Sequence, residues 1–271
     1  MAFKRLLISE LTLSRLYGAT KRRIADIPHI LAWYGSNLLS TANKEKLLQF
    51  RNRHVGQRCF ILGNGPSLSK MDLGLLNNEV TFGLNRVYLL FEQMQFMPTY
   101  YVSINELVLE QFSSDIQALP MPKFLNWNCR SHFDAEDAET SFLRLSLSVT
   151  DGFTADITQS LDSGGTVTFV ALQIAFFMGF SDVILIGVDH SFTDSGTPNA
   201  IEIRRTNIDE NHFHPNYFPK GFKWQLPDLL RSEIAYEKAK TVFEENNRRI
   251  IDATVNGKCP VFEKADFYSL F

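Results

Sequence analysis

The sequence predicts an α/β fold: a doubly wound, mostly parallel sheet with an N-terminal helical arm and a lid segment. Three observations lead to this prediction. From residue 58 onward, short apolar runs of strand length alternate with stretches of helical spacing. Brief links rich in Gly, Asn and Pro separate them, as is typical of strand–helix–strand units. A basic segment precedes this pattern, and a polar, aromatic stretch interrupts it towards the C-terminus.

Length and charge indicate one domain with additions. At 271 residues and 31.0 kDa the chain can bury a full core, and 45% hydrophobic and 21% charged residues are typical of a globular protein. Residues 1–55 carry ten Lys/Arg and three Asp/Glu, whereas the remainder carries 17 and 27. We therefore predict a basic helical arm over residues 1–55 and a single α/β domain over residues 56–271.

Cysteine usage and hydropathy indicate the compartment. Cys59, Cys129 and Cys259 are far apart and show neither CxxC nor zinc-ligand spacing, which favours a reducing environment. No signal-peptide h-region follows Met1, and the longest apolar run, residues 167–180, is too short to cross a bilayer. The sequence predicts a cytoplasmic protein, with peripheral contact to the inner membrane face as an option for the arm.

The arm has helical spacing over residues 1–50, with a cluster of Lys21, Arg22 and Arg23 followed by Trp33 and Tyr34. Basic and aromatic residues on one helix are typical of helices that bind an anionic membrane surface. One interpretation is therefore that residues 1–40 contact a membrane. The simpler reading is an arm that packs on the body or on a second subunit of a homo-oligomer. No nucleic-acid partner is expected, because the basic surface is too small.

The elements of the body follow from short apolar runs and from stop signals. Strands are expected at 59–62, 80–84, 100–104 and 123–127, with a weaker edge strand at 142–149. Helices are expected between them at 66–76, 86–97 and 107–119. A buried helix from residue 167 ends at Gly179, which fits a C-cap, and a core strand follows at 183–188. A helix at 229–245 and a strand at 249–253 close the domain.

The stretch at about 190–228 has no clear period. A segment of this length without regular structure is unusual in a compact domain unless it is a lid or a binding loop. It contains His212 and His214, and imidazole titrates near neutral pH, so either could serve as a general base. A metal site is disfavoured, because no third ligand adjoins the two histidines. The remaining alternative is a surface or packing role for each.

Polar residues follow the predicted strands at the points where each strand ends. Gly63-Asn64-Gly65-Pro66-Ser67 follow the first, and Asn85, Asn105 and Asp189 follow three others. Because the carboxyl ends of parallel strands meet at one edge, where open α/β sheets bind ligands, these residues predict a site for a nucleotide and a sugar. The GxGxxG and GK[ST] patterns are missing, so neither a dinucleotide fold nor a P-loop is supported. The alternative is that Asn merely favours turns.

Ser163, Gly164 and Gly165 lie directly before the buried helix. The free N–H groups and positive dipole end of a helix N-terminus attract anions, so these residues are candidates for binding a phosphate. The alternative is an ordinary Gly-rich entry to a buried helix.

These motifs resemble those of the bacterial sialyltransferases (glycosyltransferase family 42-like). Their GNGPS loop is matched by Gly63 to Ser67, their Asn residues after the second and third strands by Asn85 and Asn105, and their Ser-Gly helix start by Ser163-Gly164. Their Gly-x-Asp strand end is matched by Gly187-Val188-Asp189, although His190 follows where that family has tyrosines nearby. The chain is also similar to the Maf flagellin-glycosylation and 6-hydroxymethylpterin pyrophosphokinase-like proteins, which share the GNGPSL and SGG…GxD pattern over roughly residues 58–255.

The resemblance implies a Rossmann-like, GT-A-variant-like fold and a metal-independent, inverting glycosyltransferase. Gly63 to Ser67 and Asn85 would hold a CMP-type donor of a sialic or related nonulosonic acid, with no further cofactor. His212, His214 and Asp189 are the candidate catalytic residues, and a glycan, glycolipid or glycoprotein is the expected acceptor. Two alternatives are a Mg²⁺-dependent pyrophosphokinase, with Asp189, Asp194 and Asp209 as metal ligands, and a non-catalytic nucleotide-sugar-binding subunit of a polysaccharide assembly system.

Overall fold

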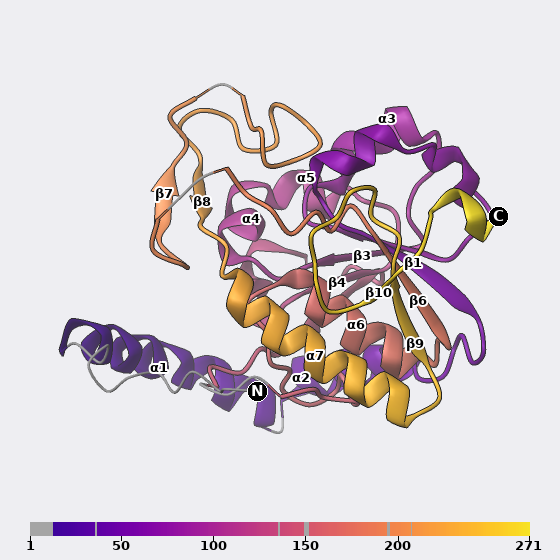
Figure 1. Cartoon of the computed structure of the whole chain (residues 1–271). Coiled ribbons are helices and arrows are strands. Elements are labelled where there is room, and N and C mark those ends of the chain that lie inside the picture. Colours follow the sequence, from indigo (N-terminus) through magenta and orange to yellow (C-terminus); the bar gives the residue numbers. More distant parts are fainter. Residues whose placement is uncertain (1–12, 36, 135, 149–151, 194–195, 207) are drawn as a thin grey trace. The chain divides into compact units, whose positions relative to one another are not determined.

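The computed structural model describes residues 13–35, 37–134, 136–148, 152–193, 196–206 and 208–271 (Figure 1). Two compact units can be distinguished, Met1–Ala42 and Asn43–Phe271. Helix α1 (Leu13–Tyr34) belongs to the first, and α2 (Leu38–Leu48) runs from the first into the second. Both lie where the sequence predicts helices. The first twelve residues of the predicted arm and Asp194 lie outside the described residues.

The second unit is built on one sheet of eight strands in the order β10-β9-β6-β1-β2-β3-β4-β5, and every neighbouring pair is parallel. The chain adds β2 to β5 on one side of β1 and returns to its other side with β6. This reversal is the doubly wound arrangement that the sequence predicts, and the fold class is confirmed. The strands are β1 (Arg58–Leu62), β2 (Thr81–Leu84), β3 (Tyr100–Ser103), β4 (Lys123–Asn126), β5 (Thr140–Leu143), β6 (Asp182–Ile186), β9 (Arg249–Asp252) and β10 (Glu263–Lys264).

The central strands are apolar because helices and loops cover them on both faces. Every residue of β2, β3 and β4 is buried, so these strands show no alternation of buried and exposed positions. This explains why their positions are predictable to within one or two residues. Strand β10 escapes prediction because it has only two residues, both charged and exposed, which pair with the end of β9.

The connections between β1 and β4 are shorter and more broken than the predicted helices. The expected helix at 66–76 is two 3₁₀ turns, because Met71 is extended between them and Asp72 caps the second turn by accepting from the Gly74 N–H. The other two expected helices each contain a break as well. The observed elements are η2 (Pro66–Lys70), η3 (Leu73–Leu76), η4 (Val87–Leu90), α3 (Phe91–Met94), α4 (Glu106–Gln111) and α5 (Ser113–Gln117), with η5 (Trp127–His132) after β4 and η6 (Tyr268–Leu270) near the C-terminus.

Two long helices, α6 (Val167–Met178) and α7 (Leu229–Glu245), pack side by side across the sheet (Figure 1). Helix α6 is apolar all round, as befits a helix enclosed by protein. It ends at Gly179, whose φ of 92° and hydrogen bonds to the Ala175 and Phe176 carbonyls confirm the predicted C-cap. None of the described helices has the length and apolarity that crossing a membrane requires.

The lid (residues 190–228) contains a two-stranded antiparallel ribbon, β7 (Ile201–Ile203) and β8 (Lys223–Gln225), that the sequence does not reveal. The residues between the two strands form a long loop. Hydrogen bonds between Arg204 and Phe222 and between Gly221 and Arg204 close the base of this loop. The described part of the lid therefore contains regular structure, a β-ribbon, that the sequence pattern does not show.

Candidate active site at the carboxyl edge of the sheet

The loop after β1 and the end of β6 are joined at the point where the strand order reverses. The carboxylate of Asp189 accepts two hydrogen bonds from Ser67, one from the backbone N–H at 3.1 Å and one from Oγ at 2.6 Å. The backbone N–H of Gly65 donates to the Gly187 carbonyl at 2.9 Å. Asp189 thus clamps the GNGPS loop onto β6, and its predicted catalytic role stays a prediction.

Two positions of this loop need glycine because residues at the end of β6 lie too close to leave room for a side chain, and not because the backbone conformation demands it. A Cβ atom at Gly65 would lie 1.8 Å from Oδ2 of Asp189, and one at Gly63 would lie 2.2 Å from the Gly187 carbonyl oxygen. Gly65 itself has an ordinary extended backbone, with a φ of −73°. The two glycines of the GNG sequence therefore allow the loop to pack directly against the residues that follow β6.

The three asparagines expected at the site have different surroundings. Oδ1 of Asn64 is buried and accepts no hydrogen bond from the described residues, while its backbone carbonyl accepts from the lid. Asn85 has a φ of 47° and accepts a hydrogen bond from Ser103 Oγ at 3.1 Å. Oδ1 of Asn105 accepts hydrogen bonds from the backbone N–H groups of residues 107 and 108 and thereby caps α4. For this oxygen the alternative raised from the sequence, a role in the local turn, therefore applies. Asn64 and Asn85 remain the better ligand candidates.

Ser163, Gly164 and Gly165 form a tight turn that leads into α6. Gly164 and Gly165 have φ values of 56° and 74°, and a Cβ at Gly164 would lie 2.5 Å from Cβ of Ala235 in α7. Thr166 is the N-cap residue, with its side chain accepting from the Thr168 N–H. Both glycines are thus needed to pack the helix entry against α7, and that entry lies at the carboxyl edge of the sheet because α6 runs back to β6.

A buried glutamine inside α6 fixes the loop that leads to this turn. Gln173 is completely buried, donates to the Asp162 carbonyl at 3.0 Å, and accepts from the Thr154 N–H at 2.9 Å. This satisfied polar side chain explains the one interruption in the apolar run.

Helix α7 connects the α6 entry with the end of β6. His190, which has a φ of 54°, pairs through Nε2 with Glu233 of α7 at 2.9 Å. One turn further along α7, the Tyr236 hydroxyl lies 3.5 Å from Oγ1 of Thr166. The side chain of Arg231 lies against Gly165. A continuous set of contacts therefore runs from the GNGPS loop through Asp189 and α7 to the turn before α6.

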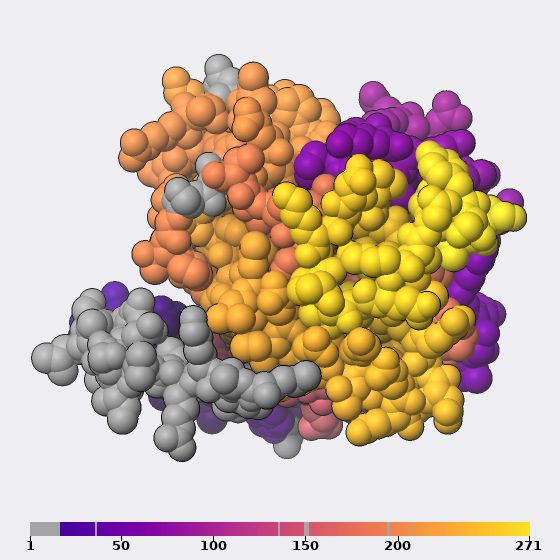
Figure 2. All heavy atoms as spheres, viewed as in Figure 1, coloured from indigo at the N-terminus to yellow at the C-terminus, as the bar shows by residue number. Residues whose placement is uncertain are grey.

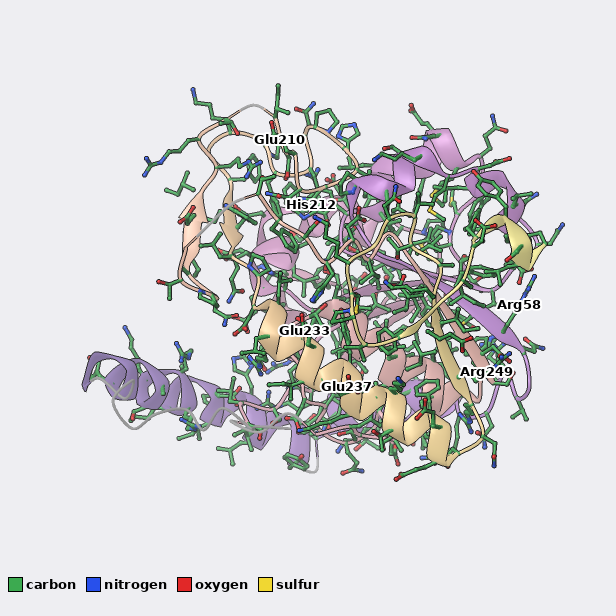
Figure 3. The ribbon with its side chains drawn as sticks, viewed as in Figure 1. Arg58, Glu210, His212, Glu233, Glu237 and Arg249 are labelled. Atoms are coloured by element: carbon green, nitrogen blue, oxygen red, sulfur yellow. The ribbon has the colours of Figure 1, made fainter. Side chains whose placement is uncertain are left out.

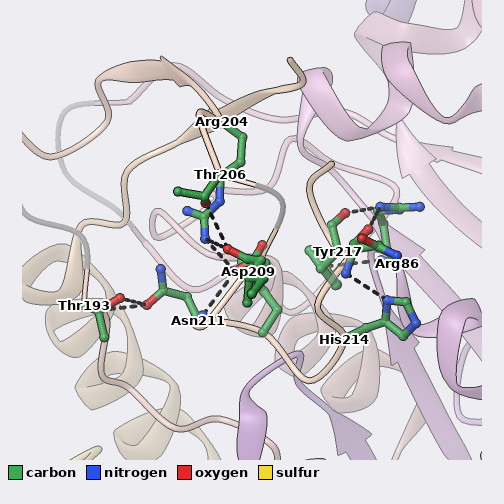
Figure 4. Close-up of polar contacts among 11 residues, drawn as sticks. Arg86, Thr193, Arg204, Thr206, Asp209, Asn211, His214 and Tyr217 are labelled. Atoms are coloured by element: carbon green, nitrogen blue, oxygen red, sulfur yellow. Dashed lines mark hydrogen bonds and ion pairs between the residues drawn. The ribbon is translucent and has the colours of Figure 1, made fainter. Parts of the chain in front are cut away.

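The tip of the lid is docked on the carboxyl edge of the sheet (Figure 4). The backbone N–H of Phe213 donates to the Asn64 carbonyl at 3.0 Å. Arg86, at the end of β2, is buried and donates through Nη1 to the carbonyls of Asn216, at 3.0 Å, and Tyr217. Its guanidinium also lies 3.8 Å from the centre of the Phe112 ring. Figure 2 shows the orange atoms of the lid region lying directly against purple atoms from the first third of the chain.

Replacing Arg86 with leucine is expected to loosen the lid tip. Hydrogen bonds from a buried charged group contribute about 1.5–3 kcal/mol, so protection of the Phe213 and Tyr217 amides against hydrogen exchange should fall about 10- to 100-fold. The amide of Ile61 in β1 should keep its protection. Arg53→Leu, at an exposed position, is the control. Unchanged protection at Phe213 and Tyr217 would show that Arg86 does not hold the lid.

His212 and His214 flank the docked Phe213, and their hydrogen bonds distinguish them. Nδ1 of His212 lies 2.9 Å from a carboxylate oxygen of Asp209, so the neutral ring carries its proton there and presents a lone pair at Nε2. Its ring stacks on Tyr217 at 3.9 Å between centroids. Nδ1 of His214 instead accepts from the Asn216 N–H at 3.1 Å, which leaves Nε2 as a donor. Only the first arrangement provides a base at Nε2.

The carboxylate that orients His212 is almost fully buried and well supported. Burial alone would raise the pKa of Asp209, but the hydrogen bond and charge of His212 and the charge of Arg204 outweigh it, so this pKa is lowered. The Asn211 N–H and Arg204 donate to the other carboxylate oxygen. The pKa of Asp189, by contrast, is raised, mainly by burial and against the hydrogen bonds from Ser67. The surroundings of Asp209 therefore favour its charged form, whereas burial works against the charge of Asp189.

The described part of the chain contains no preformed cluster of metal ligands. No set of three or more His, Cys, Asp or Glu side chains there is placed to hold an ion. Asp189 and Asp209, two of the carboxylates considered for Mg²⁺, are engaged by Ser67 and by Arg204 with His212. The expectation of a metal-independent reaction stays a prediction.

Most of the expected site residues gather around the switch point, and the structure adds others. Gly63, Asn64, Gly65, Ser67 and Asp189 are in direct contact, and the lid with His212 and His214 reaches them through Asn64. Figure 3 shows His212 in the lid above the sheet, and Glu233 on α7 below it. Sequence reasoning missed Arg86 and the His190–Glu233 pair. The sequence shows Arg86 beside Asn85, but only the fold reveals that its charge is buried.

The fold is that of a doubly wound α/β protein, and the candidate ligand site lies at its topological switch point. Residues 34–195, more than half of the chain, match the family described as 6-hydroxymethylpterin diphosphokinase MptE-like, and the chain belongs to that family. None of the curated proteins matches the sequence. The expected resemblance to the Maf and MptE-like group is thereby confirmed, whereas the sialyltransferase part stays a prediction.

A solved structure supports the same fold. The Maf glycosyltransferase from Magnetospirillum magneticum AMB-1 aligns with a TM-score of 0.51 at 16% sequence identity, over 94% of this chain and 42% of that protein. The chain thus spans less than half the length of the glycosyltransferase. At this identity the likeness establishes the architecture alone.

Proposed function

We propose that this protein is a glycosyltransferase that takes a sugar from a CMP-type nucleotide donor. The observation that carries the proposal is the position of His212. Asp209 orients its ring, and the adjacent residue, Phe213, is hydrogen-bonded to the GNGPS loop at the switch point. A positioned base beside a nucleotide-type loop is what displacement at an anomeric carbon requires.

The proposed donor site is formed by residues from two parts of this edge, the ends of β1 and β2 and the entry to α6. Asn64, whose buried Oδ1 has no hydrogen-bond partner among the described residues, and Asn85 would bind the base and ribose, since amide side chains suit neutral hydroxyl and amine partners. Ser163, Gly164, Gly165 and the N-terminus of α6 would bind the phosphate, where backbone N–H groups and the helix dipole favour an anion.

In the proposed reaction an acceptor hydroxyl oxygen attacks the anomeric carbon of the sugar. The bond between that carbon and the phosphate oxygen breaks, and CMP leaves with the electron pair. Nε2 of His212 takes the acceptor proton, and the carboxylate of Asp209 stabilises the resulting imidazolium. Attack from the face opposite the phosphate inverts the anomeric centre. No metal is needed for these steps, because the helix N-terminus would stabilise the leaving phosphate.

The acceptor is proposed to be a surface glycan, glycolipid or glycoprotein, reached from the cytoplasm, and the donor sugar to be a sialic or related nonulosonic acid. These assignments rest on the motif resemblance. The structural neighbour, which is described as a glycosyltransferase, supports sugar transfer in general.

Calorimetric titration with CMP, CDP, UDP and ATP, each with EDTA and with Mg²⁺, tests the proposal. We expect CMP to bind in EDTA with an affinity at least about tenfold above that of ATP, since the site offers amides and one helix terminus rather than a triphosphate cradle. Binding of ATP only with Mg²⁺ would favour a pyrophosphokinase instead. Binding of CMP without turnover of any CMP-sugar, including slow hydrolysis, would indicate a non-catalytic subunit.

A further inference from the structure

Helix α1 carries an exposed apolar stripe. Tyr17, Ile24, Ile27, Leu31 and Tyr34 follow one another at steps of seven, three, four and three residues, which places them on one face of an α-helix. Their exposed fractions lie between 48% and 73%. The opposite face is different, because Asp26 and Trp33 are buried there, at 5% and 0% exposure. The stripe is therefore a face that this helix does not need for its own packing.

Exposed cations border the stripe on both sides. On a helical projection Lys21 lies just beyond Tyr17, and Arg23 lies beyond Tyr34 at the other border. The sequence of α1 contains four Lys or Arg and a single acidic residue, the buried Asp26. An apolar strip with long basic side chains on both flanks is the arrangement in which Lys and Arg reach lipid phosphates while the strip enters the acyl region.

We infer that α1 lies in the surface of an anionic membrane, with Tyr17, Ile24, Ile27, Leu31 and Tyr34 inserted and Lys21 and Arg23 bound to lipid phosphate or carboxylate groups. The charge pattern selects this occupant over a second copy of the helix. Two such helices side by side would bring like charges together with no exposed acid to pair them. The tyrosines are suited to the headgroup level, where a ring can be buried while its hydroxyl stays wet.

Vesicle co-sedimentation of the full chain tests this inference. The protein is expected to sediment with vesicles of phosphatidylcholine containing 30% phosphatidylserine, and to stay in the supernatant with pure phosphatidylcholine. Lys21→Gln with Arg23→Gln should lower the partition coefficient about 30-fold, because each basic residue contributes about a factor of five. Ile24→Ser with Leu31→Ser should lower it at least about 100-fold through lost apolar burial.

The control is Leu230→Ser, which removes a side chain of similar exposure, 61%, from α7. Its partition should equal that of the unaltered protein, and thermal unfolding should show that all variants are folded. Equal binding to both vesicle types, or no loss in the two double variants, would overturn the inference. A dimer in sedimentation velocity that the Ile24→Ser/Leu31→Ser variant abolishes would also overturn it and assign the stripe to a second copy. Nucleotide titration of the same variants reports separately on the proposed function.

Discussion

Replacing His212 with alanine is expected to abolish most of the sugar transfer, lowering kcat about 100- to 10,000-fold, the usual contribution of a general base. Nucleotide affinity should stay within about twofold, because in the proposed site the GNGPS loop and the entry to α6, rather than the lid histidine, hold the donor. Steady-state transfer assays and calorimetry on the same preparation measure the two effects. A variant that loses binding together with kcat would show that His212 supports the site's structure.

His214→Ala is the matched control, since its ring lies two residues away and its Nδ1 is occupied by the Asn216 N–H. It should keep kcat within a few-fold. Asp209→Asn tests the positioning role. Its amide cannot fix the proton of His212 on Nδ1 as a carboxylate does, so kcat should fall while KM for the donor changes little. If His214→Ala loses transfer and His212→Ala does not, the base is misassigned.

Gly65→Ala is expected to destabilise the fold at the switch point. The added methyl group would lie 1.8 Å from Oδ2, 2.4 Å from Cγ and 2.9 Å from Cβ of Asp189, so the whole side chain would have to move. Overpacking of this kind lowers the free energy of unfolding by about 1–3 kcal/mol, and displacement of Asp189 should also weaken nucleotide binding. Urea denaturation and calorimetry measure the two consequences.

A double-mutant cycle separates this contact from a general effect of the methyl group. In an Asp189→Gly background the obstructing carboxylate is gone, so Gly65→Ala should cost less than half of its effect in the unaltered protein. Gly74→Ala, where the nearest atom would lie at 3.1 Å, is the control and should change stability by less than about 1 kcal/mol. Equal costs in both backgrounds would mean that the clamp is not the cause.

The central strands and the long helices α6 and α7 were predictable because their signals are local, whereas β5 begins and ends earlier than expected, at Thr140–Leu143. Helix α7 has the predicted bounds, Leu229–Glu245, and α6 ends at Gly179, because an apolar period and a left-handed glycine act within one turn. The stretch at 66–76 misled the same reasoning. Its apolar spacing suits a helix, but Ser67 bonds to Asp189, more than a hundred residues away, and Asp72 starts a separate turn.

The sequence predicted which residues would gather at the candidate site, but not which of them are held by hydrogen bonds within the fold. The gathering of GNGPS and Asp189 follows from strand order alone, since both are at the ends of neighbouring strands. The N-cap role of Asn105 is local and was available as the turn alternative. The sequence could not distinguish His212 from His214, because the difference depends on which of the two rings is hydrogen-bonded to Asp209 in the folded chain. Arg86 was hidden for the same reason, since the carbonyls that bury its charge belong to Asn216 and Tyr217.

The hydrogen bonds from Arg86 to the lid tip have a consequence for the rate of the proposed reaction. If the lid must lift for spent nucleotide to depart, the two carbonyl contacts of Arg86 and the Phe213–Asn64 bond have to break together. Contacts of that strength would keep the raised form below about 1% of molecules. Departure of the leaving group, rather than bond making, would then set the pace of the cycle, and weakening the grip would speed each round while wasting donor on water.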